Sequence, residues 1–156
     1  MSKVYRHKPL APDEHIGRVE PDGNVYETQF GPDHHVGRVE LENGKIYESR
    51  FGPDRYIGRV DAESGKVYHA KLGPDEYLGR VHADGKCYLH KPIAHDDYLG
   101  RVDRPLSLVH AGAAFLLLIL PAIEEVKEKK AEEKEKSEKN GLNPSVDPLG
   151  PTPKEG

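Results

Sequence analysis

Residues 16–27 read IGRVEPDGNVYE, and variants of this stretch return along most of the chain. An aliphatic-Gly-Arg-Val phrase occurs five times, with spacings of 20, 21, 21 and 21 residues between its glycines, Gly17, Gly37, Gly58, Gly79 and Gly100. A second phrase, Val, Ile or Cys followed by Tyr, also occurs five times, at Tyr5, Tyr26, Tyr47, Tyr68 and Tyr88. Self-similarity at such a period marks a repeat architecture. The sequence therefore predicts a repeat scaffold with five copies of each phrase.

The link between the two phrases is typical of a β-hairpin. Two links carry Asp22-Gly23 and Asp84-Gly85, and Asp-Gly suits a two-residue type I′ turn, whose positive φ angles match the strand twist. The other two links are one residue longer and end at Gly44 and Gly65, which fits a three-residue loop with a bulge. We therefore predict a mainly β fold of five pseudo-symmetric hairpin repeats.

These loop lengths predict the register of each hairpin. With Asp22-Gly23 as the loop, Val19 lies opposite Tyr26, and the longer loop gives the equivalent pair, Val39 opposite Tyr47. A slip of one residue would turn every side chain over, so the agreement supports this register. We take the Val–Tyr face as the core, with the glycine leaving room for the tyrosine ring. The predicted repeat core is Val19, Tyr26, Val39, Tyr47, Val60, Tyr68, Val81, Tyr88, Val102 and Tyr5.

The repeated arginines fall on the opposite face of the strands. There Glu27 would lie opposite Arg18, and Glu48 opposite Arg38. The structural interpretation is that the arginines stack on aromatic rings and pair with glutamates. The functional alternative is a positively charged face that binds an anion or an acidic partner. Its residues would be Arg18, Arg38, Arg59, Arg80 and Arg101.

A third phrase, Gly-Pro-Asp or a variant of it, ends each hairpin. Proline fixes φ and removes a backbone donor, and aspartate favours local turn bonds, so the chain should swing to the next hairpin there. The aspartates are therefore expected to form turns, the alternative being a cation-binding ring of Asp13, Asp33, Asp54, Asp75 and Asp96. The apolar residues just before the phrase are expected to fill the gaps between hairpins, namely Leu10, Phe30, Phe51, Leu72 and Ile93.

The two ends of the repeat region are complementary. The first copy has only its Val-Tyr strand and the last has only its Gly-Arg-Val strand. Pairing of residues 99–102 with residues 3–6 would complete a fifth hairpin and leave no exposed sheet edge. We therefore favour a closed ring over an open array of hairpins.

A ring of short hairpins built on Gly-Arg-Val, Asp-Gly and Val-Tyr phrases resembles the β-flower domains of bacteria, known mainly in a four-fold form. More distantly, it resembles the hairpin arrays called MORN repeats. The resemblance covers residues 3–104, where this chain has five copies of each phrase rather than four. MORN repeats are richer in glycine and carry a Tyr-Gly-Glu phrase that this chain lacks. The resemblance implies a fold and brings no catalytic residues.

An apolar segment follows the repeats. Residues 106–123, LSLVHAGAAFLLLILPAI, contain no charge. As a helix they would span roughly 27 Å, just short of a bilayer core of about 30 Å. Three interpretations compete: a transmembrane helix, a helix buried against the ring or in a self-associated bundle, and a membrane-surface anchor. Because a ring of small hairpins has limited surface to cover such a helix, the sequence favours membrane or oligomer.

The remainder of the chain is polar. Residues 124–139 carry Glu-to-Lys pairs four residues apart, such as Glu125–Lys129, and predict a solvated charged helix. Residues 140–156 are rich in proline and glycine and predict a disordered tail. The predicted division is therefore a hairpin ring at 1–104, an apolar helix at 105–123, a charged helix at 124–139 and the tail.

Composition and motifs argue against several functions. The net charge of −4 gives no footprint for nucleic acid. The nine histidines and the single Cys87 lack the spacing of metal sites, so we expect no metal and no cofactor. A lone His110 in the apolar segment could ligate a pigment or haem, but the simpler expectation is a hydrogen bond near the helix end. No nucleophile elbow, phosphate loop or Ser/His/Asp arrangement is visible, so we expect no catalytic residues.

The sequence thus predicts a non-catalytic scaffold or protein-interaction module. It would be held at a membrane or in a homo-oligomer by residues 106–123, with a protein as partner. The alternative is a protein that binds a small ligand or anion through the repeated arginine face. Met1 leads directly into the first repeat and there is one cysteine, so we expect no cleavable signal peptide and a location on the cytoplasmic side.

Overall fold

The computed structural model describes residues 1–140, with side chains up to residue 135. The chain divides into two compact units, one covering Met1–Ala122 and one beginning at Ile123, and each is described by itself. The predicted disordered tail lies outside the described residues, except for Asn140, which ends a helix.

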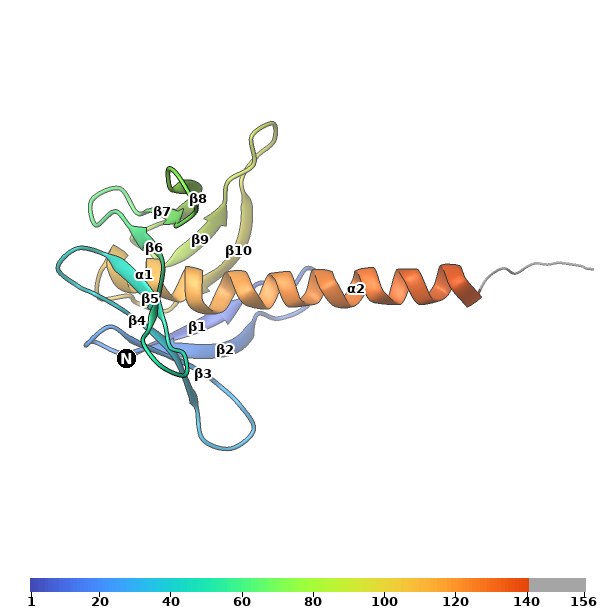
Figure 1. Cartoon of the computed structure of the whole chain (residues 1–156), viewed down its shortest axis with the longest axis horizontal. Coiled ribbons are helices and arrows are strands. Elements are labelled where there is room, and N and C mark those ends of the chain that lie inside the picture. The colour runs from blue at the N-terminus through green and yellow to red at the C-terminus, as the bar shows by residue number, and fades with distance from the viewer. Residues whose placement is uncertain (141–156) are drawn as a thin grey trace, which may run out of the picture. The chain divides into compact units, whose positions relative to one another are not determined.

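The first unit contains a closed antiparallel barrel of ten short strands, each paired with its neighbours in sequence (Figure 1). The strands are β1 (Ser2–Arg6), β2 (Glu14–Val19), β3 (Asn24–Glu27), β4 (His34–Val39), β5 (Lys45–Glu48), β6 (Arg55–Val60), β7 (Lys66–His69), β8 (Glu76–Val81), β9 (Lys86–Leu89) and β10 (Asp97–Val102). The predicted mainly β fold of five hairpin repeats is confirmed.

The ring closes as the complementary ends predict. β1 pairs with β10, so that Val4 lies opposite Val102 and Arg6 opposite Gly100. β1 also pairs with β2 on its other side. Within residues 1–140, the barrel therefore has no free strand edge that could recruit another chain.

The register of the hairpins is shifted by one residue from the prediction. Val19 lies opposite Val25, and Arg18 lies opposite Tyr26. The equivalent shift occurs in the other hairpins, where Val39 lies opposite Ile46. Because side chains alternate along a strand, the tyrosines point out of the barrel instead of into it.

The turns explain this shift. The amide of Glu20 donates to the carbonyl of Asn24, and the amide of Gly23 donates to the carbonyl of Glu20, so the loop covers residues 21–23. Gly23 has a φ of +96°, which fits a three-residue loop with glycine in the left-handed region. The longer links have four loop residues, since Glu40 donates to the carbonyl of Lys45. Each loop is thus one residue longer than the Asp-Gly motif implies.

The inner face of the barrel is formed by aliphatic residues and one cysteine. All are at most 4% exposed: Val4, Val19, Val25, Val39, Ile46, Val60, Val67, Val81, Cys87 and Val102. The predicted core valines are therefore buried. The predicted core tyrosines, Tyr5, Tyr26, Tyr47, Tyr68 and Tyr88, are half-buried on the outer face, so that part of the prediction was wrong.

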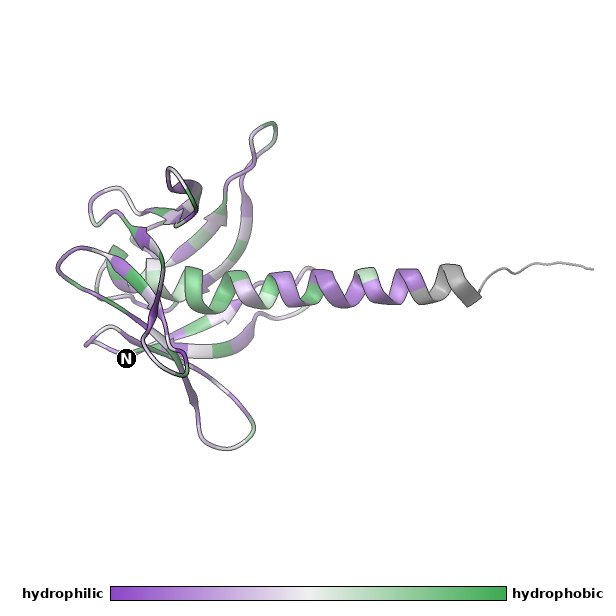
Figure 2. Cartoon of the chain, viewed as in Figure 1, coloured by the Kyte–Doolittle hydropathy of each residue, from purple (hydrophilic) through white to green (hydrophobic). Residues whose placement is uncertain are grey.

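The lumen of the barrel is occupied by the apolar segment. Helix α1 (Leu108–Ala114) continues into η1 (Phe115–Ile119), a stretch of π-helix, and then into α2 (Leu120–Asn140). Every residue from Val109 to Ile119 is buried, and Figure 2 shows this hydrophobic stretch among the strands. Of the sequence-based alternatives, burial against the ring is the one observed. A barrel encloses a helix on all sides, which supplies the surface that a flat ring would lack.

The repeated glycines lie where the paired strand and the helix both approach closely. A β-carbon on any of the five would lie 2.0–2.3 Å from the carbonyl oxygen of a repeated tyrosine. A β-carbon on Gly37 would lie 2.8 Å from Leu117 Cδ2, and one on Gly58 would lie 2.7 Å from Leu116 Cδ2. The helix approaches the strands equally closely, because a β-carbon on Gly112 would lie 2.5 Å from Val60 Cβ. Glycine on the inner face therefore accommodates the backbone of the paired strand and, in three repeats, a leucine of the helix, not tyrosine rings as predicted.

Helix α2 carries the charged part of the chain. Residues 124–135 are mostly exposed, and Lys129 lies 3.3 Å from Glu125, which confirms one of the predicted pairs. The continuous helical stretch Leu108–Glu135 is long and apolar enough to cross a membrane. However, 61% of its most apolar 18 residues are buried inside the protein. Length and composition alone cannot separate a membrane span from the core helix of a barrel.

Candidate interaction surface

The repeated arginines form a girdle on the outer face of the barrel. In four repeats, the guanidinium carbon lies 4.0–4.3 Å from the centroid of the tyrosine ring opposite, in the pairs Arg18–Tyr26, Arg38–Tyr47, Arg59–Tyr68 and Arg101–Tyr5. Stacking of a cation on an aromatic face contributes about 0.5–1 kcal/mol at exposed sites. The stacking that the sequence predicts is therefore present, with each ring on the same face as its arginine.

Aspartates complete the girdle. In four of the five Gly-Pro-Asp phrases or their variants, the carboxylate accepts a hydrogen bond from the arginine of the preceding repeat. The pairs are Arg18–Asp33, Arg38–Asp54, Arg59–Asp75 and Arg101–Asp13. The last pair spans the closure of the ring. The predicted partners Glu27 and Glu48 are not the ones observed, because the register shift moves them away. Four of the five aspartates thus hold arginines, which argues against a cation-binding ring.

The fourth repeat departs from this pattern. Arg80 is exposed and has no ion pair or aromatic stack among the described residues. The ring of Tyr88 instead lies near His82, with 4.9 Å between the ring centroids. The Gly-Pro-Asp phrase is also altered here to Ala-His-Asp, and Asp96 lies 3.4 Å from His90. Arg80 therefore serves as a natural comparison for the other four arginines.

The arginine heads do not converge on a hole. The lumen is filled by residues 109–119, and the guanidinium groups lie outside the strands against carboxylates. Hydrogen bonding to Glu20 raises the pKa of Arg18. The girdle is thus a set of compensated charges and leaves little free positive charge for an anion.

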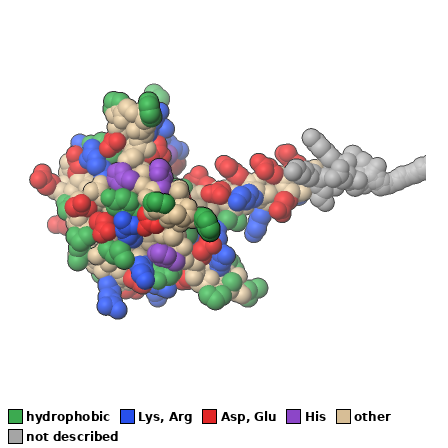
Figure 3. All heavy atoms as spheres, turned by 90° about the horizontal axis from the view of Figure 1, so that it is seen from below, with side chains coloured by type: hydrophobic (Ala, Val, Ile, Leu, Met, Phe, Trp, Pro, Cys, Tyr) green, Lys and Arg blue, Asp and Glu red, His purple; other side chains and the backbone are tan. Residues whose placement is uncertain are grey.

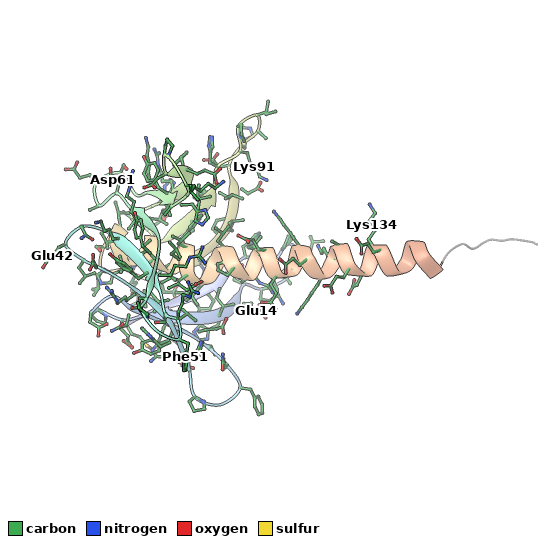
Figure 4. All side chains as sticks on the ribbon, viewed as in Figure 1. Glu14, Glu42, Phe51, Asp61, Lys91 and Lys134 are labelled. Atoms are coloured by element: carbon green, nitrogen blue, oxygen red, sulfur yellow. The ribbon has the colours of Figure 1, made fainter. Side chains whose placement is uncertain are left out.

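A different repeated feature is exposed to solvent in the part of the chain that the structure describes. The five apolar residues before the Gly-Pro-Asp phrases are between 98% and 111% exposed, in contrast to their predicted role as plugs: Leu10, Phe30, Phe51, Leu72 and Ile93. We call these five the tip residues. They lie in the loops β1–β2, β3–β4, β5–β6, β7–β8 and β9–β10, which we call the tip loops. Figure 4 labels Phe51 on one of these loops.

The tip loops stand at one end of the barrel. In a barrel whose neighbours in sequence are paired, alternate connections lie at the same end. The helix enters from the other end, where Leu108 approaches Gly65, and reaches the tip-loop end at Pro121. There Pro121 lines a cavity of about 270 Å³ together with Glu27, Ser49 and others. None of the tip residues lines this cavity.

The loop backbone explains why the tips protrude. Gly31, Gly52 and Gly73 follow three of the tip residues and have φ values of +97° to +101°, which favour glycine. A β-carbon at these glycines would meet nothing within 4 Å, so the loop backbone itself runs through open space. Two residues later, the aspartate is fastened to the arginine girdle. These three loops are therefore anchored at the base and exposed at the tip.

Basic residues accompany most of the tips. Arg50 and Lys71 directly precede Phe51 and Leu72, and Lys8 and Lys91 lie two residues before their tip residues. On the face seen in Figure 3, hydrophobic groups form separate patches interspersed with charged groups. The sequence carried the signal for this surface, since an apolar residue recurs within an otherwise polar loop in all five copies.

One repeat junction contains a hydrogen-bonded Ser–His–Asn set that the sequence analysis missed. The ring of His35 lies between Ser49 Oγ and Asn24 Oδ1, each at 2.9 Å from a ring nitrogen. It also contacts the ring of Tyr26 in a tilted arrangement, with 5.2 Å between the ring centroids. A hydroxyl held by a histidine and an oriented amide is the arrangement that activates a nucleophile. Here, however, the backbone N–H of Ser49 donates a hydrogen bond to the carbonyl oxygen of Val36, so Ser49 is part of the barrel framework. We take this set as a structural hydrogen-bond cluster that joins β3, β4 and the residue that follows β5.

His110 has a structural environment. One ring nitrogen lies 2.9 Å from the carbonyl oxygen of Pro21 and must donate to it, while the other lies 2.8 Å from Ser107 Oγ. Ser107 also caps α1 by accepting from the backbone amide of His110. Both nitrogens are therefore used near the helix start, as the simpler sequence expectation holds. Among the described residues, no group of three His, Cys, Asp or Glu side chains is placed to hold a metal ion.

Comparison with known proteins adds no relative to this picture. No family model, curated protein or solved structure matches the chain.

Proposed function

We propose that this chain is a non-catalytic docking scaffold, in which a rigid barrel presents five apolar tips to a binding partner. The observation that carries the proposal is the near-complete exposure of an apolar side chain at the same loop position in all five repeats. An exposed apolar surface that recurs in this way marks an interaction site better than scattered single residues do.

The fold itself gives no reason for these side chains to be apolar. Four of the five loops are held by arginine–aspartate bonds at their bases, and the core is formed by the inner valines and the helix. A serine in place of Phe30 or Phe51 would leave these contacts intact. Contact with a partner accounts for the apolar side chains, because burying each one on binding removes its surface from water.

The sequence analysis expects residues 106–123 to anchor the protein in a membrane or an oligomer. This role is incompatible with their burial inside the barrel. Those residues would have to leave the barrel before they could enter a bilayer or an oligomer core, and the lumen would lose Phe115 and Ile119, both fully buried. We therefore assign the interaction to the tip loops. Binding of an anion on the arginine face is less favoured, since four of the five arginines already hold carboxylates.

A photo-cross-linking amino acid placed at position 51 in the full chain, expressed in its native cells, tests the proposal. The matched control is position 41, where Leu41 is partly exposed in a turn at the opposite end of the barrel. The proposal expects abundant cross-links from position 51 and few from position 41. Equal or absent cross-linking at the two positions would contradict it. The mass of the cross-linked species shows whether the partner is a protein, a second copy or a lipid.

A further inference from the structure

We infer that the partner of the tip loops is a lipid bilayer, and that the tip residues insert into the boundary between headgroups and acyl chains. This inference rests on the proposed docking function and names its partner. The argument uses the shapes of the tip residues, their separation from one another and the charges beside them.

The tip residues share apolarity and not shape. The position is occupied by two phenylalanines, two leucines and one isoleucine, Phe30, Phe51, Leu10, Leu72 and Ile93. A protein pocket at the centre of an interface is complementary in shape to its anchor. A fluid acyl-chain region accepts aromatic, γ-branched and β-branched side chains alike. Variation of shape with retention of apolarity therefore favours lipid over a set of shaped pockets.

The tips are also separate from one another. Each is exposed to the full extent of its side chain, and the cavity at this end of the barrel includes none of them. A peptide or a helix from a partner protein would need a continuous groove between the loops. A bilayer needs none, because each tip can insert on its own.

The charges beside the tips fit the headgroup region. Four of the five tip loops carry a lysine or arginine one or two residues before the tip, and such side chains can extend their charge to lipid phosphates. Three of these lysines lie 3.0–3.7 Å from a carboxylate in the same loop region, in the pairs Lys8–Glu14, Lys71–Glu76 and Lys91–Asp97. The free positive charge is therefore small. Binding should depend on tip insertion more than on the content of anionic lipid.

The absence of tryptophan from the sequence allows a direct test with the full chain. Phe51→Trp places a single fluorophore at a tip, and Leu41→Trp places the matched control at the opposite end of the barrel. Both are mixed with vesicles of phosphatidylcholine and phosphatidylglycerol whose acyl chains carry bromine, which quenches tryptophan on contact. We expect a blue shift and strong quenching for Phe51→Trp and neither for Leu41→Trp. Binding should persist at high salt, because the apolar term is not screened.

A second measurement keeps the inference falsifiable. Flotation with the same vesicles measures the partition coefficient of variants in which one tip residue is replaced by serine. Each replacement should lower this coefficient about tenfold, because burial of one such apolar side chain changes a binding constant by about that factor. Circular dichroism verifies that each variant is folded. If the full chain does not float with vesicles, or if both tryptophans are quenched equally, the lipid inference is wrong. If position 51 then still cross-links to a protein in cells, the docking function survives without it.

Discussion

Leu118 of the central helix packs directly against Gly17 of β2, because a β-carbon on Gly17 would lie 2.7 Å from Leu118 Cδ1. Two neighbouring leucines make the same contact with the glycines of the next repeats, Leu117 with Gly37 and Leu116 with Gly58. All three leucines lie in η1, where π-helical hydrogen bonding widens the turn. Three consecutive residues thus contact three consecutive repeats, and this joins the pseudo-symmetric barrel to a single asymmetric helix.

Replacement of Leu118 by alanine should therefore destabilise the barrel strongly. Removal of a buried leucine side chain costs about 2–5 kcal/mol through lost burial and the cavity that remains. The matched control is Leu72→Ala, which truncates a fully exposed leucine in a tip loop and should change the free energy of unfolding by less than about 0.5 kcal/mol. Urea denaturation measures both. Similar small effects at the two positions would mean that the helix does not lie in the lumen.

Removal of residues 1–6 should unfold the barrel or lower its stability greatly. These residues include β1, which pairs with β2 on one side and β10 on the other and places the fully buried Val4 in the core. The truncation opens the ring and exposes two strand edges. Thermal unfolding and sedimentation measure the loss of cooperativity and any association. A truncated chain that melts at the same temperature as the full chain would be inconsistent with a closed ring.

The arginine girdle gives a prediction with a control inside the protein. Arg59 stacks at 4.1 Å over Tyr68 and lies 3.1 Å from Asp75, whereas Arg80 has neither contact among the described residues. Because Arg59 is 41% exposed, its contacts are screened, and Arg59→Ala should cost about 1 kcal/mol. Arg80→Ala should change stability by less than about 0.5 kcal/mol. Chemical denaturation of the two variants decides the point, and equal losses would show that the girdle adds no stability.

Cys87 should be unreactive in the folded protein. It is completely buried on the inner face of β9, and burial raises the pKa of its thiol. Since the thiolate is the reactive form, a thiol reagent at pH 8 should label it only when the barrel opens. The labelling rate should rise steeply as urea unfolds the chain. Rapid labelling without denaturant would place Cys87 outside the core.

The repeats themselves explain how much of the fold the sequence could predict. Complementary half-repeats at the two ends predicted that residues 99–102 pair with residues 3–6, and they do. The register prediction was supported only by the agreement between hairpins with loops of two different lengths, and it was wrong. Both loops proved one residue longer than the Asp-Gly motif implies, so the check could not detect a shift common to all hairpins.

The position of the helix and the exposure of the tips were harder to predict. An inward-facing glycine in every repeat indicates a close approach by another group. The sequence does not say whether that group is a tyrosine ring, the backbone of the paired strand or a helix side chain such as Leu118. Similarly, an apolar residue such as Phe51 before Gly-Pro-Asp is equally compatible with a plug and with an exposed tip. The three-dimensional path of the loop decides between them, and local patterns do not encode it.

The most direct test of the account is a nuclear Overhauser measurement between the methyl groups of Leu118 and the α-protons of Gly17 in the full chain without detergent. The account predicts strong cross-peaks, because the two residues are in contact within the barrel. Equivalent cross-peaks should join Leu117 to Gly37. Their absence in the folded protein, with these leucine methyls in contact with added detergent instead, would contradict the central claim that the chain folds around its own apolar helix.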